Sequence, residues 1–519
     1  MRTTGFATLA LYVSLATARA VQLEGLTVPE EYASNKDDVV TIFKDAFAAY
    51  QKFAFGHDDV KPVSGGFLDS RNGWGATVAD ALGTMLIMGL DDLYAIGLNH
   101  TANIDFSKSK TASTVSVFET TIRYVGGMLS AYELGGKKDD ILIQKAQEVA
   151  DKLAFAWVGE NAMPYGFVNF DTNTPTVANS NIAEAGTLII EWDRLTEYTK
   201  NATYLALAEK SMRAIATRND TLLPGLAGQG VNPTDGTFSS KYISWGGASD
   251  SYFEYLLKYA RLTNNADTLW IETWKTAVDS SLKSLAKRTT VGNWLMLADM
   301  DDQSRIRHVS SHLACFHGGN FILGGQLLNN DTIVKAGLEL TDACINTYTS
   351  TATGIGPEAF AFISSDGNFT GGSTPSADQI DFNEKNGFYI TSGQYILRPE
   401  VMESNFYAWR ATGDTKYLDN AAAFVKQLQA TARVPSSGGY AALNDVNKAA
   451  GGGFIDDTES FFFAEVLKYL YLTFDDPAHI SLDEWTFNTE SHPFQAPTEL
   501  PSYDPSETGP VRCTKTKRR

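Results

Sequence analysis

The sequence has few cysteines, few histidines, no long apolar segment and a shortage of basic residues. Its 519 residues contain 3 cysteines and 7 histidines, with no CxxC or HExxH motif, so there is little material for a zinc site. No apolar run reaches the roughly 20 residues that a membrane-spanning helix needs. Basic residues number 42 against 61 acidic ones, and this net charge of −19 argues against nucleic acid or anionic membranes as partners.

The first twenty residues, MRTTGFATLALYVSLATARA, have the pattern of a secretory signal peptide. An early arginine precedes an apolar run from Gly5 to Ala18, and Ala18-Arg19-Ala20 is a small-x-small cleavage pattern. We therefore expect residues 1–20 to be removed and the protein to enter the secretory pathway and be secreted. Five N-x-[ST] sequons agree with export and are candidate glycosylation sites: Asn99, Asn201, Asn219, Asn330 and Asn368.

The three cysteines divide between the body of the chain and its end. An oxidising compartment favours a disulfide between Cys315 and Cys344, which would leave Cys513 without a partner. The alternative is that all three cysteines are unpaired thiols. His308 and His312 stand four residues apart with His317 beyond, which could form a zinc face. No Cys or Glu set at ligand spacing accompanies them, so this remains the weaker reading.

A helical repeat fills the chain. In VSVFETTIRYVGGMLSAYEL the apolar residues follow a period of 3.6, as expected of a helix with one continuous apolar stripe. Similar dense segments recur to give seven, and more ordinary amphipathic stretches such as YLALAEKSMRAIATR run between them. Dense helices belong inside and amphipathic ones outside, because only an outer ring meets water.

This alternation predicts an all-α fold, an (αα)7 barrel in which seven inner and seven outer helices close into one ring. We expect a single catalytic domain over residues 37–494. Short runs such as GFVNFDT and AFAFISSDG are predicted to be small β-hairpins on loops. The end of the chain, residues 495–519, is rich in proline and lysine and is predicted to be disordered.

Acidic residues recur on the dense helices or on the loops before them, where a structural role is the simplest explanation for each one alone. Glu119 could pair with Arg123 one turn later, and Ser251-x-x-Glu254 reads as a capping box that leaves Asp250 unexplained. Pro399 is expected at the first helical position, so Glu400 and Glu403 would lie on one face of a helix start.

Taken together, these carboxylates need another explanation, because a ring of unpaired carboxylates would repel itself. The set comprises Glu119, Glu184, Asp250, Glu358, Glu400, Glu403, Glu459, Glu465 and Glu490. A cavity that also held aromatic rings (Trp74, Phe461) and arginines (Arg123, Arg398) would suit a sugar. It would also suit a hard divalent cation, and two separated carboxylates are the machinery of glycoside hydrolysis.

Ordered motifs along the chain resemble one family, the class I α-1,2-mannosidases of glycoside hydrolase family 47. The blocks run from SRNGWGATVADALGTMLIMGL through FETTIR, SDSYFEYLLKY, HLACF, IGPE, YILRPEVMES and ESFFFAEVLKYLYLTF to FNTESHPF. The short loops and leader look most like the secreted fungal members. The resemblance implies an (αα)7 barrel and Ca2+-dependent, inverting removal of α-1,2-linked mannose from high-mannose N-glycans on glycoproteins.

The resemblance also implies roles for individual residues. Thr489 of FNTESHPF would bind Ca2+, with waters held by Glu403, Glu465 and Glu490. Glu119 would be the general acid acting through a water, Glu400 the base, and Asp250 a third essential carboxylate, with Glu358 a further possible donor. The acid is left open among Glu119, Asp250 and Glu358. Residues Arg123, Glu184, His312, Arg398 and Phe461 would line the sugar site, and Cys315 and Cys344 match the family's disulfide.

One departure concerns substrate choice. Family members selective for a single glycan branch carry arginine two residues before the aspartate of the DS motif, where this chain has Ala248. We therefore expect several α-1,2 mannoses to be removed, by a monomeric enzyme.

Three alternatives to hydrolysis fit the sequence less well. A non-hydrolytic mannose-binding quality-control lectin on the same fold would be expected to lack an essential carboxylate, and none is missing here. An isoprenoid cyclase would carry a DDxxD motif, which does not occur. A purely structural helical-repeat scaffold would not gather carboxylates on one axis.

Overall fold

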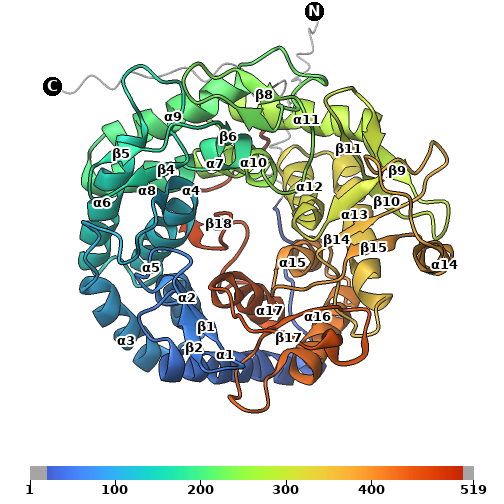
Figure 1. Ribbon diagram of the computed structural model, residues 1–519, viewed down its shortest axis with the longest axis horizontal. Coiled ribbons are helices and arrows are strands. Elements are labelled where there is room, and N and C mark those ends of the chain that lie inside the picture. The colour runs from blue at the N-terminus through green and yellow to red at the C-terminus, as the bar shows by residue number, and fades with distance from the viewer. Residues whose placement is uncertain (1–19, 506–519) are drawn as a thin grey trace, which may run out of the picture.

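A computed structural model describes residues 20–505 of the chain. The predicted leader, apart from Ala20, and Cys513 lie outside the described residues. Within them the helices form a closed double ring around a central space, into which the β18 hairpin projects (Figure 1). No helix in this part of the chain combines the length and apolarity that a bilayer crossing requires.

The inner ring contains seven helical segments, as the sequence predicts. They are α2 (Ala76–Ile87); α4 (Val117–Thr120) continued by a π-helical turn (Thr121–Val125) and α5 (Gly126–Leu134); α7 (Ile182–Gly186) with α8 (Ile189–Thr199); α10 (Asp250–Leu262); α12 (His317–Leu327); α15 (Glu400–Thr412); and a π-helical turn (Phe462–Val466) continued by α17 (Leu467–Phe474). These are the dense segments of the sequence, and α10 shows why: all its residues from Ser251 to Leu262 are buried.

The outer ring contains the seven amphipathic helices. They are α1 (Ala33–Phe53), α3 (Asp91–Ala102), α6 (Ile141–Leu153), α9 (Thr203–Ala216), α11 (Leu269–Ser284), α13 (Asp331–Thr349) and α16 (Lys416–Gln427). Helix α1 packs against both α16 and α17, which closes the ring (Figure 1). The short helix α14 (Ala377–Asn386) lies outside both rings. The predicted (αα)7 barrel is therefore confirmed.

The loops between the helices contain small antiparallel sheets of two or three strands. The strands are β1 (Asp59–Lys61), β2 (Gly66–Leu68), β3 (Val115–Ser116), β4 (Phe167–Asn169), β5 (Thr174–Pro175), β6 (Ser180–Asn181), β7 (Gly230–Val231), β8 (Phe238–Ser240), β9 (Ala286–Arg288), β10 (Leu295–Leu297), β11 (Asp299–Met300), β12 (Ile306–Arg307), β13 (Val309–Ser311), β14 (Ala359–Ala361), β15 (Tyr389–Ser392), β16 (Ala442–Leu443), β17 (Phe454–Ile455), β18 (Trp485–Phe487) and β19 (Pro493–Gln495). The predicted hairpin at GFVNFDT is β4 with β5, and AFAFISSDG supplies β14.

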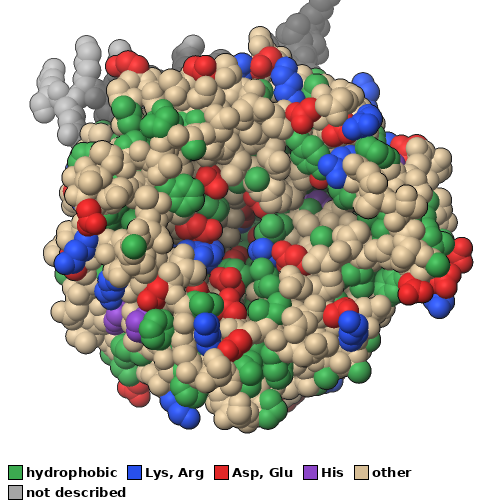
Figure 2. Space-filling model, viewed as in Figure 1, with side chains coloured by type: hydrophobic (Ala, Val, Ile, Leu, Met, Phe, Trp, Pro, Cys, Tyr) green, Lys and Arg blue, Asp and Glu red, His purple; other side chains and the backbone are tan. Residues whose placement is uncertain are grey.

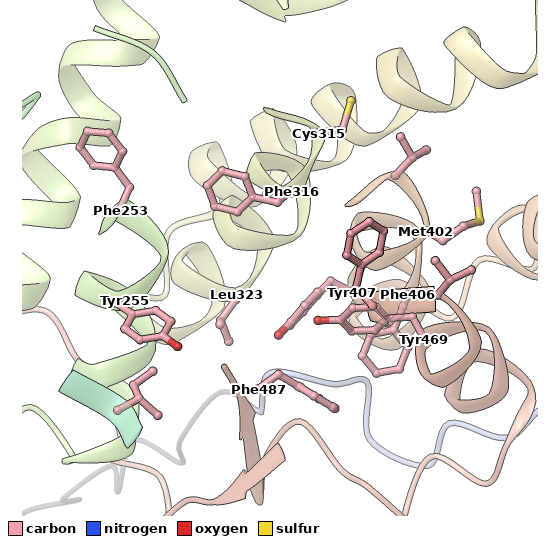
Figure 3. Close-up of a cluster of buried hydrophobic side chains, with 14 of the residues drawn as sticks. Phe253, Tyr255, Cys315, Phe316, Leu323, Met402, Phe406, Tyr407, Tyr469 and Phe487 are labelled. Atoms are coloured by element: carbon pink, nitrogen blue, oxygen red, sulfur yellow. The ribbon is translucent and has the colours of Figure 1, made fainter. Parts of the chain in front are cut away.

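The hairpin of β18 and β19 enters the ring and packs against the inner helices. Phe487 lies 6.1 Å from Phe406 of α15 and 5.7 Å from Tyr469 of α17, measured between ring centroids. Figure 3 shows Phe487 below these rings, in a buried cluster that also contains Tyr255 and Leu323. Ring contacts with α15 and α17 and packing against α10 therefore fix the hairpin, and with it the residues at its turn.

Several local expectations differ from the structure. Ser251 does not cap α10: its hydroxyl bonds Thr187, and Glu254 pairs with Lys258 one turn later. The capping box is therefore wrong, because Asp250 already begins the helix. Pro399 is the N-cap of α15 rather than its first residue. The predicted disulfide between Cys315 and Cys344 is present and joins the 3-10 turn before α12 to α13.

The end of the described chain is packed where disorder was expected. Tyr503 is buried, and its backbone N–H donates to the carbonyl of Leu327 at 2.9 Å. Arg261 reaches the carbonyl of Pro497 at 2.8 Å. Buried arginine and tyrosine side chains thus hold residues 495–505 against the ring, which the proline-rich composition did not reveal.

Candidate active site

The first turns of the inner helices bring the predicted carboxylates together. Outer helices return the chain between inner ones, so the inner helices run in one direction and their N-terminal ends share one face of the ring. Asp250 and Glu400 are the first residues of α10 and α15. Helix N-termini favour negative charge, which helps to keep carboxylates at this face.

Two further glutamates are positioned by matching helix caps. The hydroxyl of Ser116 accepts the backbone N–H of Glu119 at 3.2 Å at the start of α4. Asn181 does the same for Glu184 at 2.9 Å at the start of α7. In both places a short strand ends at a capping residue whose side chain satisfies a free helix donor. The cap fixes where each glutamate leaves the backbone.

These residues line a cavity of about 530 Å³ at the centre of the ring. Figure 2 shows acidic and basic side chains gathered around this hollow. Of the residues predicted from the sequence, the lining includes Glu119, Arg123, Glu184, Asp250, Arg398, Glu400, Phe461, Glu465, Thr489 and Glu490. A cavity of this size with charged walls and an aromatic ring suits one or two sugar units.

Glu400 is held by a buried histidine. Its Oε2 lies 2.6 Å from Nδ1 of His312, whose Nε2 lies 2.7 Å from the hydroxyl of Tyr348. Burial tends to raise the pKa of Glu400, but the hydrogen bond and charge of His312, with Arg398, outweigh it and the pKa is lowered. Glu400 is therefore kept as a carboxylate, which suits a general base.

Glu119 is also kept ionised, by two arginines. Its Oε2 accepts from Nε of Arg123 at 2.7 Å and from Nε of Arg71 at 3.3 Å. Burial tends to raise the pKa of Glu119, and the two guanidinium groups more than offset it, so the pKa is lowered. A carboxylate in this state does not carry a proton of its own to a leaving group.

Asp250 has the opposite state. Burial raises its pKa to about 7; the backbone N–H of Ser251 opposes this, and the charges of Glu254 and Glu400 add to it. The same cavity therefore holds Glu400 ionised and Asp250 able to keep a proton near neutral pH. Two carboxyl groups whose environments push their pKa values apart are typical of acid and base pairs in glycosidases.

A smaller cavity of about 40 Å³ continues below the first. Its lining comprises Asp250, Glu254, Leu313, Phe316, Glu400, Glu403, Glu465 and Thr489. Burial raises the pKa of Glu403 to about 8 and holds that of Glu465 well above its usual range. The described residues contain no group of three or more His, Cys, Asp or Glu side chains placed to hold a metal directly. A Ca2+ ion here would therefore need oxygens of Thr489 and waters on the carboxylates as ligands.

The turn between β18 and β19 places Thr489 between the two cavities. The side chain of Asn488 organises the turn: its Oδ1 accepts from the backbone of Glu490 at 2.9 Å and of His492 at 2.7 Å. Lys468, fully buried on α17, donates to the carbonyl of Ser491. The side chains of Asn488 and Lys468 therefore shape the turn that carries Thr489.

Arg123 ties this turn to the cavity wall. It pairs with Glu490, and its Nη1 lies 3.5 Å from Asp80. Asp80 also contacts Nε2 of His492 at 3.3 Å. Burial lowers the pKa of His492 to about 4, against the influence of Asp80, so its ring is neutral. Glu490 is thus a partner of Arg123 at the cavity wall.

Three predicted site residues lie behind the large cavity. His312 was predicted to contact the sugar. It is buried, and both of its ring nitrogens are occupied by Glu400 and Tyr348, so it positions Glu400 instead. Both oxygens of Glu358 accept from Nε of Arg398, at 2.8 and 2.9 Å. Glu403 belongs to the lower cavity. Phe461 lines the large cavity, with Arg123 and Arg398 over its ring at 5.5 and 5.8 Å.

Arg71 and Asp80 are the main site residues that sequence reasoning missed. Arg71 lines the cavity and stands next to Glu119, while the carboxylate of Asp58 holds its backbone N–H at 2.7 Å. Asp80 is an acidic residue within the dense segment GATVADALGTML. A lone carboxylate on an all-buried helix was the signal that could have found it.

The histidines of the possible zinc face have separate partners. His308 contacts Ser364 at 2.9 Å and Asp366 at 3.1 Å, away from Glu400 and His312. His317 packs against Phe321 on α12, and burial lowers its pKa to about 3.

The five sequons lie on the outside of the ring or its loops. Asn99, Asn219 and Asn368 are exposed, and Asn201 and Asn330 are partly buried. The side chain of Asn330 accepts two backbone N–H groups as the N-cap of α13.

Comparisons with known proteins agree with this architecture. Residues 42–496 match glycosyl hydrolase family 47. A probable mannosyl-oligosaccharide alpha-1,2-mannosidase 1B from Aspergillus clavatus is 40% identical over 91% of this chain and 95% of its own length. The mannosyl-oligosaccharide alpha-1,2-mannosidase of Penicillium citrinum is 39% identical over 90% of this chain and 92% of its own.

A solved structure from the same group of enzymes is also similar to this chain. The alpha-1,2-mannosidase from Trichoderma reesei superposes with a TM-score of 0.86 at 37% identity, covering 89% of this chain and 99% of that one.

Proposed function

The chain belongs to glycosyl hydrolase family 47 and is a glycoside hydrolase, and from this we propose that it removes terminal α-1,2-linked mannose from high-mannose N-glycans by an inverting, Ca2+-dependent reaction. The observation that carries the mechanism is that Glu400 and Asp250 line one cavity in different surroundings, with His312 bonded to Glu400 alone of the two. His312 and Arg398 lower the pKa of Glu400, which favours its ionised form, while burial raises the pKa of Asp250 to about 7, which favours its protonated form below neutral pH.

In the proposed reaction, Glu400 takes a proton from the water that attacks the anomeric carbon. The leaving oxygen receives a proton from the opposite side, and the C–O bond to the rest of the glycan breaks. Inversion needs both carboxyl groups because one activates the water while the other assists departure. Asp250 is the better source of that proton, since Arg123 and Arg71 hold Glu119 ionised. Glu119 would then orient the water that relays the proton.

Binding of the terminal mannose is assigned to the walls of the large cavity. Glu184 and Arg398 offer hydrogen-bonding groups, and the ring of Phe461 offers a face to the sugar. Ca2+ would be held by oxygens of Thr489 and by waters on Glu403, Glu465 and Glu490, and when bound it would fix sugar hydroxyls. Ala248 lines the same cavity and leaves space beside Asp250, so several α-1,2 mannoses should be accepted.

We further propose export through the secretory pathway by a leader of residues 1–20, followed by secretion. The leader pattern and the five sequons support this, as does the disulfide between Cys315 and Cys344.

The test is mannose release from Man-α-1,2-Man, with Man-α-1,3-Man and Man-α-1,6-Man as matched controls. The Ca2+-loaded protein should cleave only the first disaccharide, and Glu400→Gln should abolish cleavage while retaining sugar binding. Binding without release by the unsubstituted protein would contradict hydrolysis and would support the lectin alternative.

A further inference from the structure

The residue that follows the predicted cleavage pattern is buried against the other end of the chain. Val21 is 0% exposed. Its backbone nitrogen lies 2.7 Å from Oδ1 of Asp483, and the nitrogen of Gln22 lies 3.3 Å from the same oxygen. The first two residues after Ala20 thus share one carboxylate oxygen, 462 positions away for Val21.

The side chain of Gln22 is also fixed by hydrogen bonds. Its Oε1 accepts from Nη1 of Arg410 at 3.0 Å and from the backbone of Leu482 at 3.1 Å. Its Nε2 donates to the carbonyl of Pro477 at 3.2 Å. Both ends of the amide are therefore satisfied by groups from two distant segments, as expected of a residue with a fixed structural position.

Arg410 connects Gln22 to the segment that follows α17. It is fully buried at the end of α15, where its Nη1 donates to the carbonyl of Pro477 at 2.8 Å and its Nη2 to that of Leu472 at 2.9 Å. The carbonyl of Arg410 in turn accepts the N–H of Leu23 at 2.7 Å. The chain from Val21 onward is thus integrated into the ring.

We propose that this is a docking site for a new N-terminus: hydrolysis of the Ala20–Val21 peptide bond gives Val21 an α-ammonium group that forms an ion pair with Asp483. Water is the co-reactant, and signal peptidase is the catalyst implied by the cleavage pattern. The Ala20 carbonyl carbon gains the water oxygen and leaves as a carboxylate. The freed nitrogen is protonated. The processing part of this proposal rests on the proposed leader; the ion pair does not.

The geometry favours a charged group at this nitrogen. A free α-amino group has an ordinary pKa of about 7.7–8.0 and is charged below that. A hydrogen bond between an ammonium and a carboxylate is stronger than one from a neutral amide, above all where water is largely excluded. Cleavage would therefore strengthen the contact between Val21, the first residue of the mature chain, and Asp483 in the segment before β18.

The pairing can be tested with chains of defined N-terminus, independently of any signal peptidase. We would prepare Ca2+-loaded protein beginning at Val21 and the same protein with Gly-Ser before Val21, each with and without Asp483→Asn. The chain beginning at Val21 should have a thermal midpoint about 2 °C higher than the extended chain. Asp483→Asn should remove that difference, whereas Glu484→Gln, a change at the exposed neighbour, should leave it.

Equal midpoints for the two N-termini, or a difference that survives Asp483→Asn, would overturn the ion pair. A second readout is acylation of the α-amino group, followed by peptide mass spectrometry. The Val21 amine should react about 10-fold more slowly than in Asp483→Asn, and equal reactivity would count against docking.

N-terminal sequencing of the secreted protein tests the processing step by itself. A start at Val21 supports it, and a start at any other residue overturns it. Mannose release from Man-α-1,2-Man should be the same in all four chains, so failure of the proposed function would appear there and not in the stability comparison.

Discussion

His312 lies directly behind Glu400, with Nδ1 of the imidazole 2.6 Å from the carboxylate and Nε2 2.7 Å from the hydroxyl of Tyr348. An ionised carboxylate only accepts hydrogen bonds, so Nδ1 carries a proton and the ring points it at Glu400. The histidine thus fixes both the direction and the charge of the proposed base.

Replacing His312 by alanine should lower kcat about 10- to 100-fold, with a smaller change in KM, because a freed Glu400 side chain loses its alignment. It should also move the acidic limb of the kcat/KM profile to higher pH, since His312 lowers the pKa of Glu400. Tyr348→Phe keeps the contact between His312 and Glu400 and serves as the control. An unchanged acidic limb in His312→Ala would contradict this role.

Asp250→Asn should lower kcat about 10²- to 10⁴-fold, because the amide cannot supply the proton that the leaving oxygen needs. In the unsubstituted enzyme, the pKa of about 7 predicts loss of activity as the pH rises through neutrality. A pH–rate profile with a defined α-1,2 disaccharide measures both. Glu119→Gln with a greater loss than Asp250→Asn, and with the alkaline limb removed, would instead make Glu119 the acid.

Chelation of Ca2+ should destabilise the protein more at pH 8 than at pH 5.5. Burial raises the folded-state pKa of Glu403 to about 8, so without metal the folded state binds more protons than the unfolded one between about 4.5 and 8. Its stability therefore falls as pH rises through that range, and bound Ca2+ would restore it. Thermal midpoints with EDTA or Ca2+ at both pH values test this; a Ca2+ effect that is the same at both would oppose it.

Ala248→Arg should narrow the range of mannoses that are released. Ala248 lines the cavity two residues before Asp250, and a guanidinium there would fill space open to the rest of the glycan. The unsubstituted enzyme is expected to remove several mannoses from a nine-mannose glycan, and the variant to stall after fewer. Mass spectrometry of the digests measures this. Because Ala248 has a φ of 68°, Ala248→Gly is a suitable control and should keep the broad pattern.

Removal of the disulfide should cost about 3 kcal/mol of stability, because the bridge between Cys315 and Cys344 closes a loop with a sequence separation of 29. Denaturant unfolding of Cys315→Ala with Cys344→Ala measures it. Cys513→Ala changes the cysteine outside this bridge and is the matched control; an equal loss there would argue against a specific role for the bridge.

The barrel could be predicted because its two rings differ in composition. Helices buried all round, such as α10, read as dense apolar segments, and outer helices such as α9 read as amphipathic. Packing at the ends of the chain could not be predicted in this way. The backbone of Val21 is held by Asp483, and the backbone of Tyr503 by Leu327 and Asn265. These contacts join segments far apart in the sequence and leave no periodic pattern.

The site was predicted mainly from motifs, and the differences have physical causes. His312 was expected at the sugar because it matches a sugar-contacting position of the family. Its contact with Glu400 joins residues 88 positions apart and leaves no signal in the sequence. Glu254 resembled a cap, yet its partner is the buried Lys258. Arg71 was missed because a lone arginine in a loop carries no spacing signal.

The most direct test of the account is the anomeric form of the first mannose that the Ca2+-loaded enzyme releases from Man-α-1,2-Man, followed by proton NMR before mutarotation. A water activated by Glu400 on the face opposite the leaving group should give β-mannose first, and Glu400→Gln should give none. Release of α-mannose first, or unchanged release by Glu400→Gln, would contradict the proposed role of Glu400.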